Sequence, residues 1–184
     1  MTMSDFQESG INFCFKSSWM ILKYDDHVAH KKVEKFLKST KAVDFLGIHN
    51  DKLYFVEIKN YRGHTQDEST KEVLGSKGEE LMHRIAIKVR DAMASSIGSA
   101  RFSTNDNEFF AKVNQLLLDD NNKIMVIACV ELDVSNEKER KAKMGIWQQK
   151  LKQKLSWLHA AKISVNSVDN ITDIIPDLDV SFVE

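Results

Sequence analysis

Cysteine, proline and long apolar runs are scarce in this sequence, and each scarcity excludes a class of protein. Cys14 and Cys129 are its two cysteines and form no CxxC pair, so we expect neither a disulfide framework nor a thiolate zinc site. No apolar run approaches the roughly 20 residues needed to cross a bilayer. The N-terminal residues MTMSDFQESGINF also lack the basic start and apolar core of a signal peptide. These absences predict a cytoplasmic protein that does not enter a membrane.

An excess of charge of one sign is missing as well. The formal net charge is −1, so no overall basic surplus indicates a nucleic-acid partner, and any binding surface must arise from local charge arrangement. The motifs GxxxxGK[ST], GxGxxG and GxSxG do not occur. Nucleotide-hydrolase, dinucleotide-binding and α/β-hydrolase functions are therefore without support.

The composition that is present suits one globular domain. A chain of 184 residues with 42% hydrophobic residues is long enough for one well-formed core and short for two. Pro176 is the single proline, and neither a Ser/Gly-rich linker nor an internal repeat divides the chain. We therefore expect a single domain that comprises residues 1–184.

Apolar periodicity predicts the order of the elements. Helices are expected over residues 23–38, 79–96, 106–118 and 141–160, strands over 123–132, 162–168 and 179–183, a hairpin over 41–60 and a long loop over 61–80. Gly98 suits the C-terminal cap of the helix over 79–96, and residues 12–24 fit either a strand or a helix. This order predicts an α/β or α+β fold in which helices sandwich a mixed sheet.

Three charged side chains stand out in the apolar hairpin KAVDFLGIHNDKLYFVEIKN, residues 41–60. If Asn50 and Asp51 form a two-residue turn, the pairing runs outward from the turn and places Asp44 opposite Glu57. Side chains alternate along a strand, so Lys59 shares their face and lies diagonally across from Asp44. The apolar members of this face are Leu46, Ile48, Leu53 and Phe55.

Two carboxylates directly opposite each other, with Cβ atoms about 5 Å apart, destabilise a sheet. A divalent metal bridging both is the natural compensating cation, because magnesium is typically held by one or two carboxylates together with waters and phosphate oxygens. Lys59 then lies where it can hold a water or neutralise a phosphate. Two alternatives remain: a register slip of one residue separates Asp44 from Glu57, and any one of these charges alone is ordinarily a solvated surface group.

Asp44, followed thirteen residues later by Glu57-Ile58-Lys59 at the end of an apolar strand, resembles the motif of the PD-(D/E)xK nuclease superfamily. The resemblance extends from about residue 24 to residue 167, although only the hairpin is specific, and Val43 stands where the motif name has proline. It implies a restriction-endonuclease-like α/β fold, a mixed β-sheet flanked by helices with an αβββαβ-type core.

The resemblance also implies roles for the motif residues. Asp44, Glu57 and the backbone carbonyl of Ile58 would ligate Mg²⁺ or Mn²⁺, and Lys59 would position or activate the water that hydrolyses a phosphodiester. Many members add an acidic residue from the first helix, for which Glu34 and Asp26 are candidates.

Further candidates for contacting metal or phosphate lie beyond the motif. They are Tyr61 and Arg62 after the motif strand, and Arg84 and Lys88 on the following helix. Arg84 and Lys88 are each at least as readily explained as part of a solvated helix face.

We therefore expect a small metal-dependent nuclease that acts on DNA rather than RNA, as a homodimer or as a subunit of a larger complex. Repair, recombination and defence against foreign DNA are all compatible with such an activity. The alternative is a non-catalytic nucleic-acid-binding or assembly subunit that keeps the nuclease fold. Retention of Asp44, Glu57 and Lys59 together argues against that alternative.

Overall fold

The computed structural model describes residues 3–119, 121, 123–159 and 161–183. Its strands are β1 (Ser4–Glu8), β2 (Ile11–Phe15), β3 (Met20–Lys23), β4 (Phe45–His49), β5 (Lys52–Asn60), β6 (Ile124–Glu131), β7 (Lys162–Asn166) and β8 (Leu178–Phe182). Its helices are α1 (Val28–Phe36), α2 (Glu68–Phe102), α3 (Asn107–Leu117), α4 (Glu137–Lys154) and α5 (Val168–Ile171).

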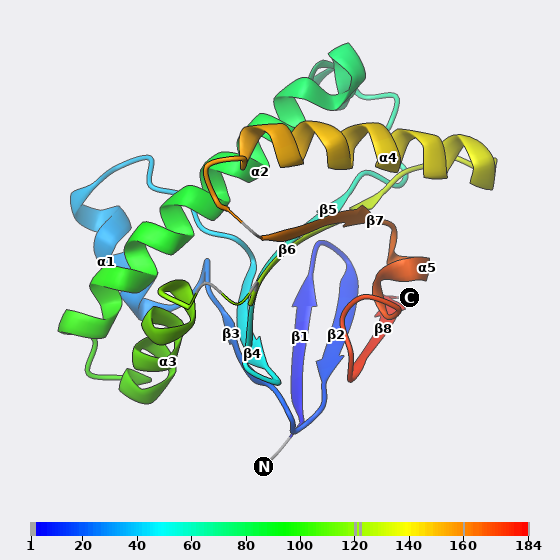
Figure 1. Cartoon of the computed structure of the whole chain (residues 1–184). Coiled ribbons are helices and arrows are strands. Elements are labelled where there is room, and N and C mark those ends of the chain that lie inside the picture. The colour runs from blue at the N-terminus through cyan, green and yellow to red at the C-terminus, as the bar shows by residue number, and fades with distance from the viewer. Residues whose placement is uncertain (1–2, 120, 122, 160, 184) are drawn as a thin grey trace.

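The strands form two sheets (Figure 1). The larger sheet has the order β3-β4-β5-β6-β7; β3, β4 and β5 pair antiparallel, whereas β6 runs parallel to both β5 and β7. The smaller sheet, β1-β2-β8, is antiparallel. The prediction of an α/β fold with a mixed sheet is therefore confirmed.

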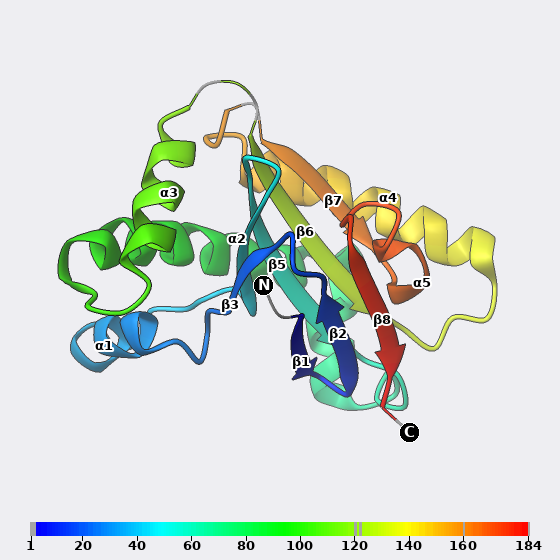
Figure 2. The same ribbon diagram turned by 90° about the horizontal axis from the view of Figure 1, so that it is seen from below.

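The two faces of the larger sheet are covered differently. Helices α2 and α4 lie over one face, and the smaller sheet lies over the other (Figures 1 and 2). Each face has its own apolar core: Phe55 packs with residues from the helices, whereas Val56 packs with residues from the smaller sheet and α5. The expectation that helices sandwich the sheet is thus wrong for one face. On that face the sheet is covered by β1, β2 and β8, which come from the two opposite ends of the chain.

The hairpin of β4 and β5 has the predicted turn and register. Asn50 and Asp51 both adopt left-handed backbone, with φ of 47° and 54°, as a two-residue hairpin turn requires. His49 pairs with Lys52, and the ladder continues outward to the pair of Phe45 and Val56. The predicted apolar face is confirmed, since the helix-side core contains Leu46, Ile48, Leu53 and Phe55.

Strand β6 occupies the centre of the parallel half of the sheet, as its nearly unbroken apolar run predicts. Ala128 faces the helix-side core, and the adjacent Cys129 faces the core between the two sheets. Burial raises the pKa of the Cys129 thiol, so this cysteine remains protonated at neutral pH.

Residues 61–80 do not form the long loop that was predicted, because α2 begins at Glu68. Gly78 lies at an irregularity within the helix, where Lys77 and Gly78 have left-handed φ values of 58° and 72°. A Cβ on Gly78 would lie 2.2 Å from Trp147 Nε1, so the missing side chain lets α4 pack closely there. Gly98 is not the cap either, since α2 continues to Phe102.

The order of elements differs from the αβββαβ order that the resemblance implies. Strand β3 precedes α1 and pairs with β4, so α1 is inserted between two adjacent strands of the sheet. Strands β1 and β2 come earlier still and belong to the smaller sheet, as does the predicted C-terminal strand β8. No helix among the described residues combines the length and apolar character needed to cross a membrane.

Candidate functional site

Asp44 and Glu57 lie where the central strands of the larger sheet meet its helix-covered face. Asp44 immediately precedes β4, and Glu57 lies within β5, one position beyond the last described pair of the β4–β5 ladder. Both residues are buried, with 3% and 1% of their surface exposed. The backbone N–H of Ile58 donates a 2.6 Å hydrogen bond to Asp44 Oδ2, which fixes the orientation of the Asp44 carboxylate relative to β5.

Two lysines from different elements contact these carboxylates. Lys59 Nζ, from β5 itself, lies 2.5 Å from Glu57 Oε1 and donates to the carbonyl oxygen of Ile58 at 3.1 Å. Lys88 Nζ, from α2, lies 2.6 Å from the same Glu57 oxygen and 3.4 Å from Asp44 Oδ1. The ammonium group of Lys88 therefore bridges the two carboxylates.

Two further carboxylates, Glu8 and Asp25, complete an acidic cluster with Asp44. Their ligand atoms lie within 4.8 Å of one another. Asp25 lies between β3 and α1, and Glu8 ends β1 in the smaller sheet. Lys23 Nζ lies 3.0 Å from Glu8 Oε2 and balances part of this charge. The site thus draws on both sheets and on α2.

Sequence reasoning missed Asp25 and Glu8 as site residues. Asp25 adjoins Asp26, and both acidic residues precede a helix, so the local signal did not say which one faces inward. Asp26 is an exposed surface group that pairs with Lys23 and Lys31. No local sequence pattern marks Glu8, because its position depends on how the smaller sheet packs against the larger one.

Burial and mutual repulsion govern protonation at this site. Burial, followed by the nearby Asp44 charge, raises the pKa of Glu57 to about 7, even though Lys59 and Lys88 act in the opposite direction. Burial, followed by Asp44, likewise raises the pKa of Asp25 to about 6. For Lys59 burial lowers the pKa, but Glu57 and Asp44 outweigh it and raise the pKa above its ordinary value. Lys59 is therefore an ammonium group at neutral pH.

The carboxylates also have unused capacity to bind a cation. Glu57 Oε2 and Asp25 Oδ1 are buried and have no hydrogen-bond partner among the residues that the structure describes. Buried oxygens are ordinarily satisfied, and a set of carboxylate oxygens is the donor set that Mg²⁺ and Mn²⁺ prefer. The side chains gathered here therefore fit a hard divalent cation.

The other predicted contacts lie elsewhere or at the margin. Glu34 is on α1, with its nearest cation, Lys31, at 4.0 Å. Arg84 pairs with Glu80 at 2.7 Å on the exposed side of α2, and Arg62 lies over the ring of Phe182 at 4.2 Å. Tyr61 is half-buried, and burial, with a smaller contribution from Glu57, raises the pKa of its hydroxyl although Arg84 and Lys88 act in the opposite direction.

Asp44, Glu57 and Lys59 are therefore brought together with Lys88. Glu34 and Arg62 make contacts away from the cluster, whereas Asp26 lies at its exposed margin, where it shares Lys23 with Glu8. Tyr61 borders the cluster through electrostatic interactions with Glu57 and Lys88, and Arg84 interacts with Tyr61 and Glu80 instead. Comparison with known proteins adds no relative: no family model, curated protein or solved structure matches this chain.

Proposed function

We propose that this protein is a metal-dependent nuclease of the PD-(D/E)xK type that hydrolyses phosphodiester bonds in DNA. The observation that carries the proposal is the convergence of the three motif side chains in one cluster around two buried carboxylates. Glu57 Oε1 lies 2.5 Å from the Lys59 ammonium, and Lys88 connects Glu57 to Asp44. A purely solvated surface role is incompatible with the burial of Asp44 and Glu57, and Lys59 is itself only partly exposed.

Mg²⁺ or Mn²⁺ would be held by Asp44 and Glu57, with the carbonyl of Ile58 as a further ligand, and Asp25 and Glu8 lie close enough to Asp44 to share the ion with it. When bound, such an ion lowers the pKa of a coordinated water and offsets charge on the phosphate.

Lys59 and Lys88 have different roles in this proposal. Lys59 is protonated at neutral pH, so it orients a water or a phosphate oxygen by donating hydrogen bonds rather than by accepting a proton. Lys88 reaches both carboxylates from α2 and would turn toward the phosphate when a metal takes over neutralisation of Asp44. Binding to DNA would then depend on positive charge near the cluster, because the whole chain has none in excess.

Cleavage assays with single-stranded, double-stranded and branched DNA, and with RNA, test the proposal in Mg²⁺, Mn²⁺ and EDTA. We expect cleavage of DNA that requires the metal. Asp44→Asn and Lys59→Ala should each slow it by about 100-fold or more, the usual scale for losing one group that stabilises transition-state charge. Glu108→Gln is the matched control, since it neutralises an exposed acidic residue of α3 that lies outside the cluster. Cleavage that both site substitutions leave unchanged would refute the assignment.

A second function is favoured by one observation. Lys59 and Lys88 already neutralise Glu57, and Lys88 connects it to Asp44. The cluster can therefore serve as an internal ion-pair network in a nucleic-acid-binding or assembly subunit. In that case DNA binding would persist with no cleavage under any metal condition. Asp44→Asn would then lower stability without affecting any activity.

The proposed chemistry suits several biological settings. A nuclease of this size would act as a homodimer or as a subunit of a larger complex, in repair, recombination or defence against foreign DNA. Light scattering of the purified protein, alone and with DNA, distinguishes a dimer from a monomer that needs a partner.

A further inference from the structure

The segment from α1 to the start of β4 combines dense positive charge with exposed apolar side chains. Residues 28–41 contain a single acidic residue, Glu34, among five lysines: Lys31, Lys32, Lys35, Lys38 and Lys41. Phe36 at the end of α1 is 74% exposed, and Leu37 beside it is 65% exposed. We call residues 28–41 the α1 arm.

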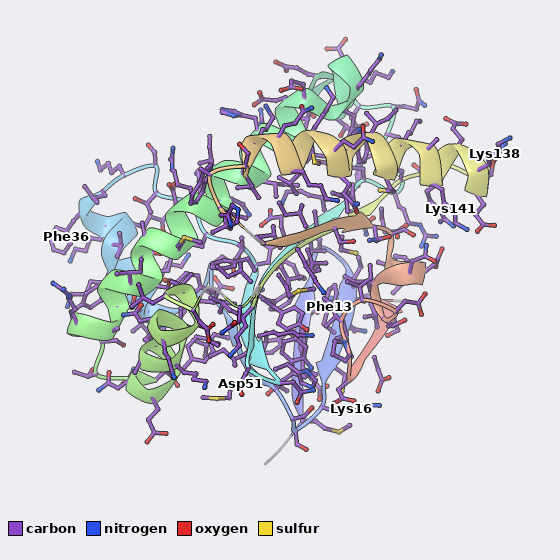
Figure 3. The ribbon with its side chains drawn as sticks, viewed as in Figure 1. Phe13, Lys16, Phe36, Asp51, Lys138 and Lys141 are labelled. Atoms are coloured by element: carbon purple, nitrogen blue, oxygen red, sulfur yellow. The ribbon has the colours of Figure 1, made fainter. Side chains whose placement is uncertain are left out.

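The apolar residues at the tip of the α1 arm do not serve the core. Ala29 and His30 are the buried residues of the helix, and both lie at its beginning. Figure 3 shows Phe36 at the outer edge of the molecule, directed away from it, whereas Phe13 lies inside, between the sheets. An exposed ring gains no free energy from burial, and Phe36 together with the neighbouring Leu37 forms an exposed apolar pair rather than a single exposed residue. Phe36 is therefore available to a ligand.

The lysines of the α1 arm are also largely available. Lys31 makes long contacts of 3.8 and 4.0 Å with Asp26 and Glu34. Lys32 lies over the Phe102 ring at 4.6 Å and attaches the arm to the end of α2. Among the residues that the structure describes, no carboxylate forms an ion pair with Lys35, Lys38 or Lys41.

The α1 arm begins and ends at the carboxylate cluster. Asp25 lies three residues before its first residue, and Asp44 lies three residues after its last. The backbone N–H of Tyr24 donates to the carbonyl of Asp44 at 2.8 Å, which brings the base of the arm to one point. The helix of nine residues carries Phe36 roughly 12 Å away from that base. An extended ligand bound along the α1 arm would therefore reach the carboxylate cluster.

We propose that the α1 arm binds single-stranded nucleic acid, with a base stacked on Phe36 and phosphates on the lysines around it. Proteins that bind single strands combine a positively charged track with aromatic rings that stack on bases, because a single strand exposes the faces of its bases and a duplex does not. This inference rests on the proposed nuclease and names its substrate as DNA with a single-stranded segment beside the scissile bond.

The charge of the α1 arm selects nucleic acid over a second copy of the chain. A symmetric dimer through Phe36 would bring the lysine-rich arms of both copies together, and like charges in an interface oppose association. The remainder of the chain is net negative, since the arm is basic and the whole chain carries −1. A polyanion with stacking bases matches both the charge and the aromatic ring.

Fluorescence anisotropy in EDTA, with a labelled 12-nucleotide DNA strand and the corresponding duplex, tests the inference without any cleavage. We expect the single strand to bind more tightly than the duplex. Phe36→Ala should weaken single-strand binding at least about fivefold, the low end for losing one stacked base. Lys35→Ala with Lys38→Ala should reduce the slope of log affinity against log salt by about 1.4, or about 0.7 for each phosphate contact.

Trp157→Ala is the matched control, since this exposed aromatic lies after α4 and should leave binding unchanged. Wild-type affinity in Phe36→Ala overturns the inference, as does a wild-type dimer that Phe36→Ala dissociates in light scattering. Equal loss of affinity in Trp157→Ala and Phe36→Ala overturns it too. The anisotropy experiment measures binding and not cleavage. If the protein binds single-stranded DNA through Phe36 but never cleaves DNA, only the proposed nuclease activity is refuted. A nuclease unaffected by Phe36→Ala would refute this inference alone.

Discussion

Glu57 is the residue at which burial and charge oppose each other most directly. Its carboxylate is 1% exposed and touches two ammonium groups, yet burial and Asp44 raise its pKa to about 7. Because this value exceeds the ordinary 4.5, folding takes up a proton at intermediate pH. The stability that Glu57 contributes is therefore complete below its ordinary pKa and is lost as the pH rises through about 7.

In the metal-free state, we expect Glu57→Gln to gain stability relative to the wild type as the pH rises from about 5 to about 8. The amide carries no charge, so only the wild type bears the cost of ionising a buried carboxylate. Between these two pH values, the free energy of unfolding of Glu57→Gln relative to the wild type should rise by about 3 kcal/mol, as a pKa shift of this size implies. Urea denaturation in EDTA measures it, with Glu108→Gln as the exposed control. A difference that does not vary with pH would contradict the expectation.

Some residues of the site were predictable from the sequence, and others were not. Asp44, Glu57 and Lys59 were identifiable because hairpin pairing and strand alternation are local rules. Asp25 and Asp26 were not distinguishable, since neighbouring residues before a helix carry the same signal and only packing turns one of them inward.

Among the elements, α2 departs most from expectation. Its first turns are polar and contain Gly75 and Gly78, so the local pattern favours a loop. They are helical because Val73 and Leu74 pack against the helix-side core and because α4 lies against Gly78. Tertiary contacts here override the low helix propensity of glycine.

The two glycines provide a matched pair of substitutions. We expect Gly78→Ala to destabilise the protein by about 2 kcal/mol or more, because a Cβ there would meet the Trp147 ring and the backbone is left-handed. Gly75→Ala should be neutral or stabilise the protein by up to about 1 kcal/mol, since nothing lies within 4 Å of its Cβ position. Thermal or urea denaturation compares them. Equal effects of both substitutions would show that α4 does not pack against α2 as described.

For the whole molecule, the packing of the smaller sheet on the larger one decides what surrounds the carboxylate cluster. Glu8 reaches the cluster from β1, and Lys23 Nζ lies 3.0 Å from its carboxylate. The sheets are held together by apolar residues of both, including Phe13 and Phe45, whose ring centroids are 5.3 Å apart. The smaller sheet is thus part of the site as well as a cover for the core.

We expect Glu8→Gln to weaken binding of Mn²⁺ by about tenfold or more, the scale on which neighbouring carboxylates tune a metal site. Asp5→Asn is the control, because Asp5 lies on the same strand and is exposed. Isothermal titration calorimetry at about pH 8, where Glu57 and Asp25 are deprotonated, measures the affinity. Unchanged affinity in Glu8→Gln would restrict the metal to the residues of the larger sheet.

The sequence by itself determined the hairpin, its register and the grouping of Asp44, Glu57 and Lys59, because turn chemistry and side-chain alternation act over a few residues. It also determined β6 as a strand covered on both faces, through its continuous apolar run. Only the tertiary structure decided that the second cover is a sheet built from both ends of the chain, that Lys88 bridges the carboxylates, and that Glu8 joins them. These features depend on contacts between residues far apart in the chain, and no local pattern encodes which distant surfaces will meet.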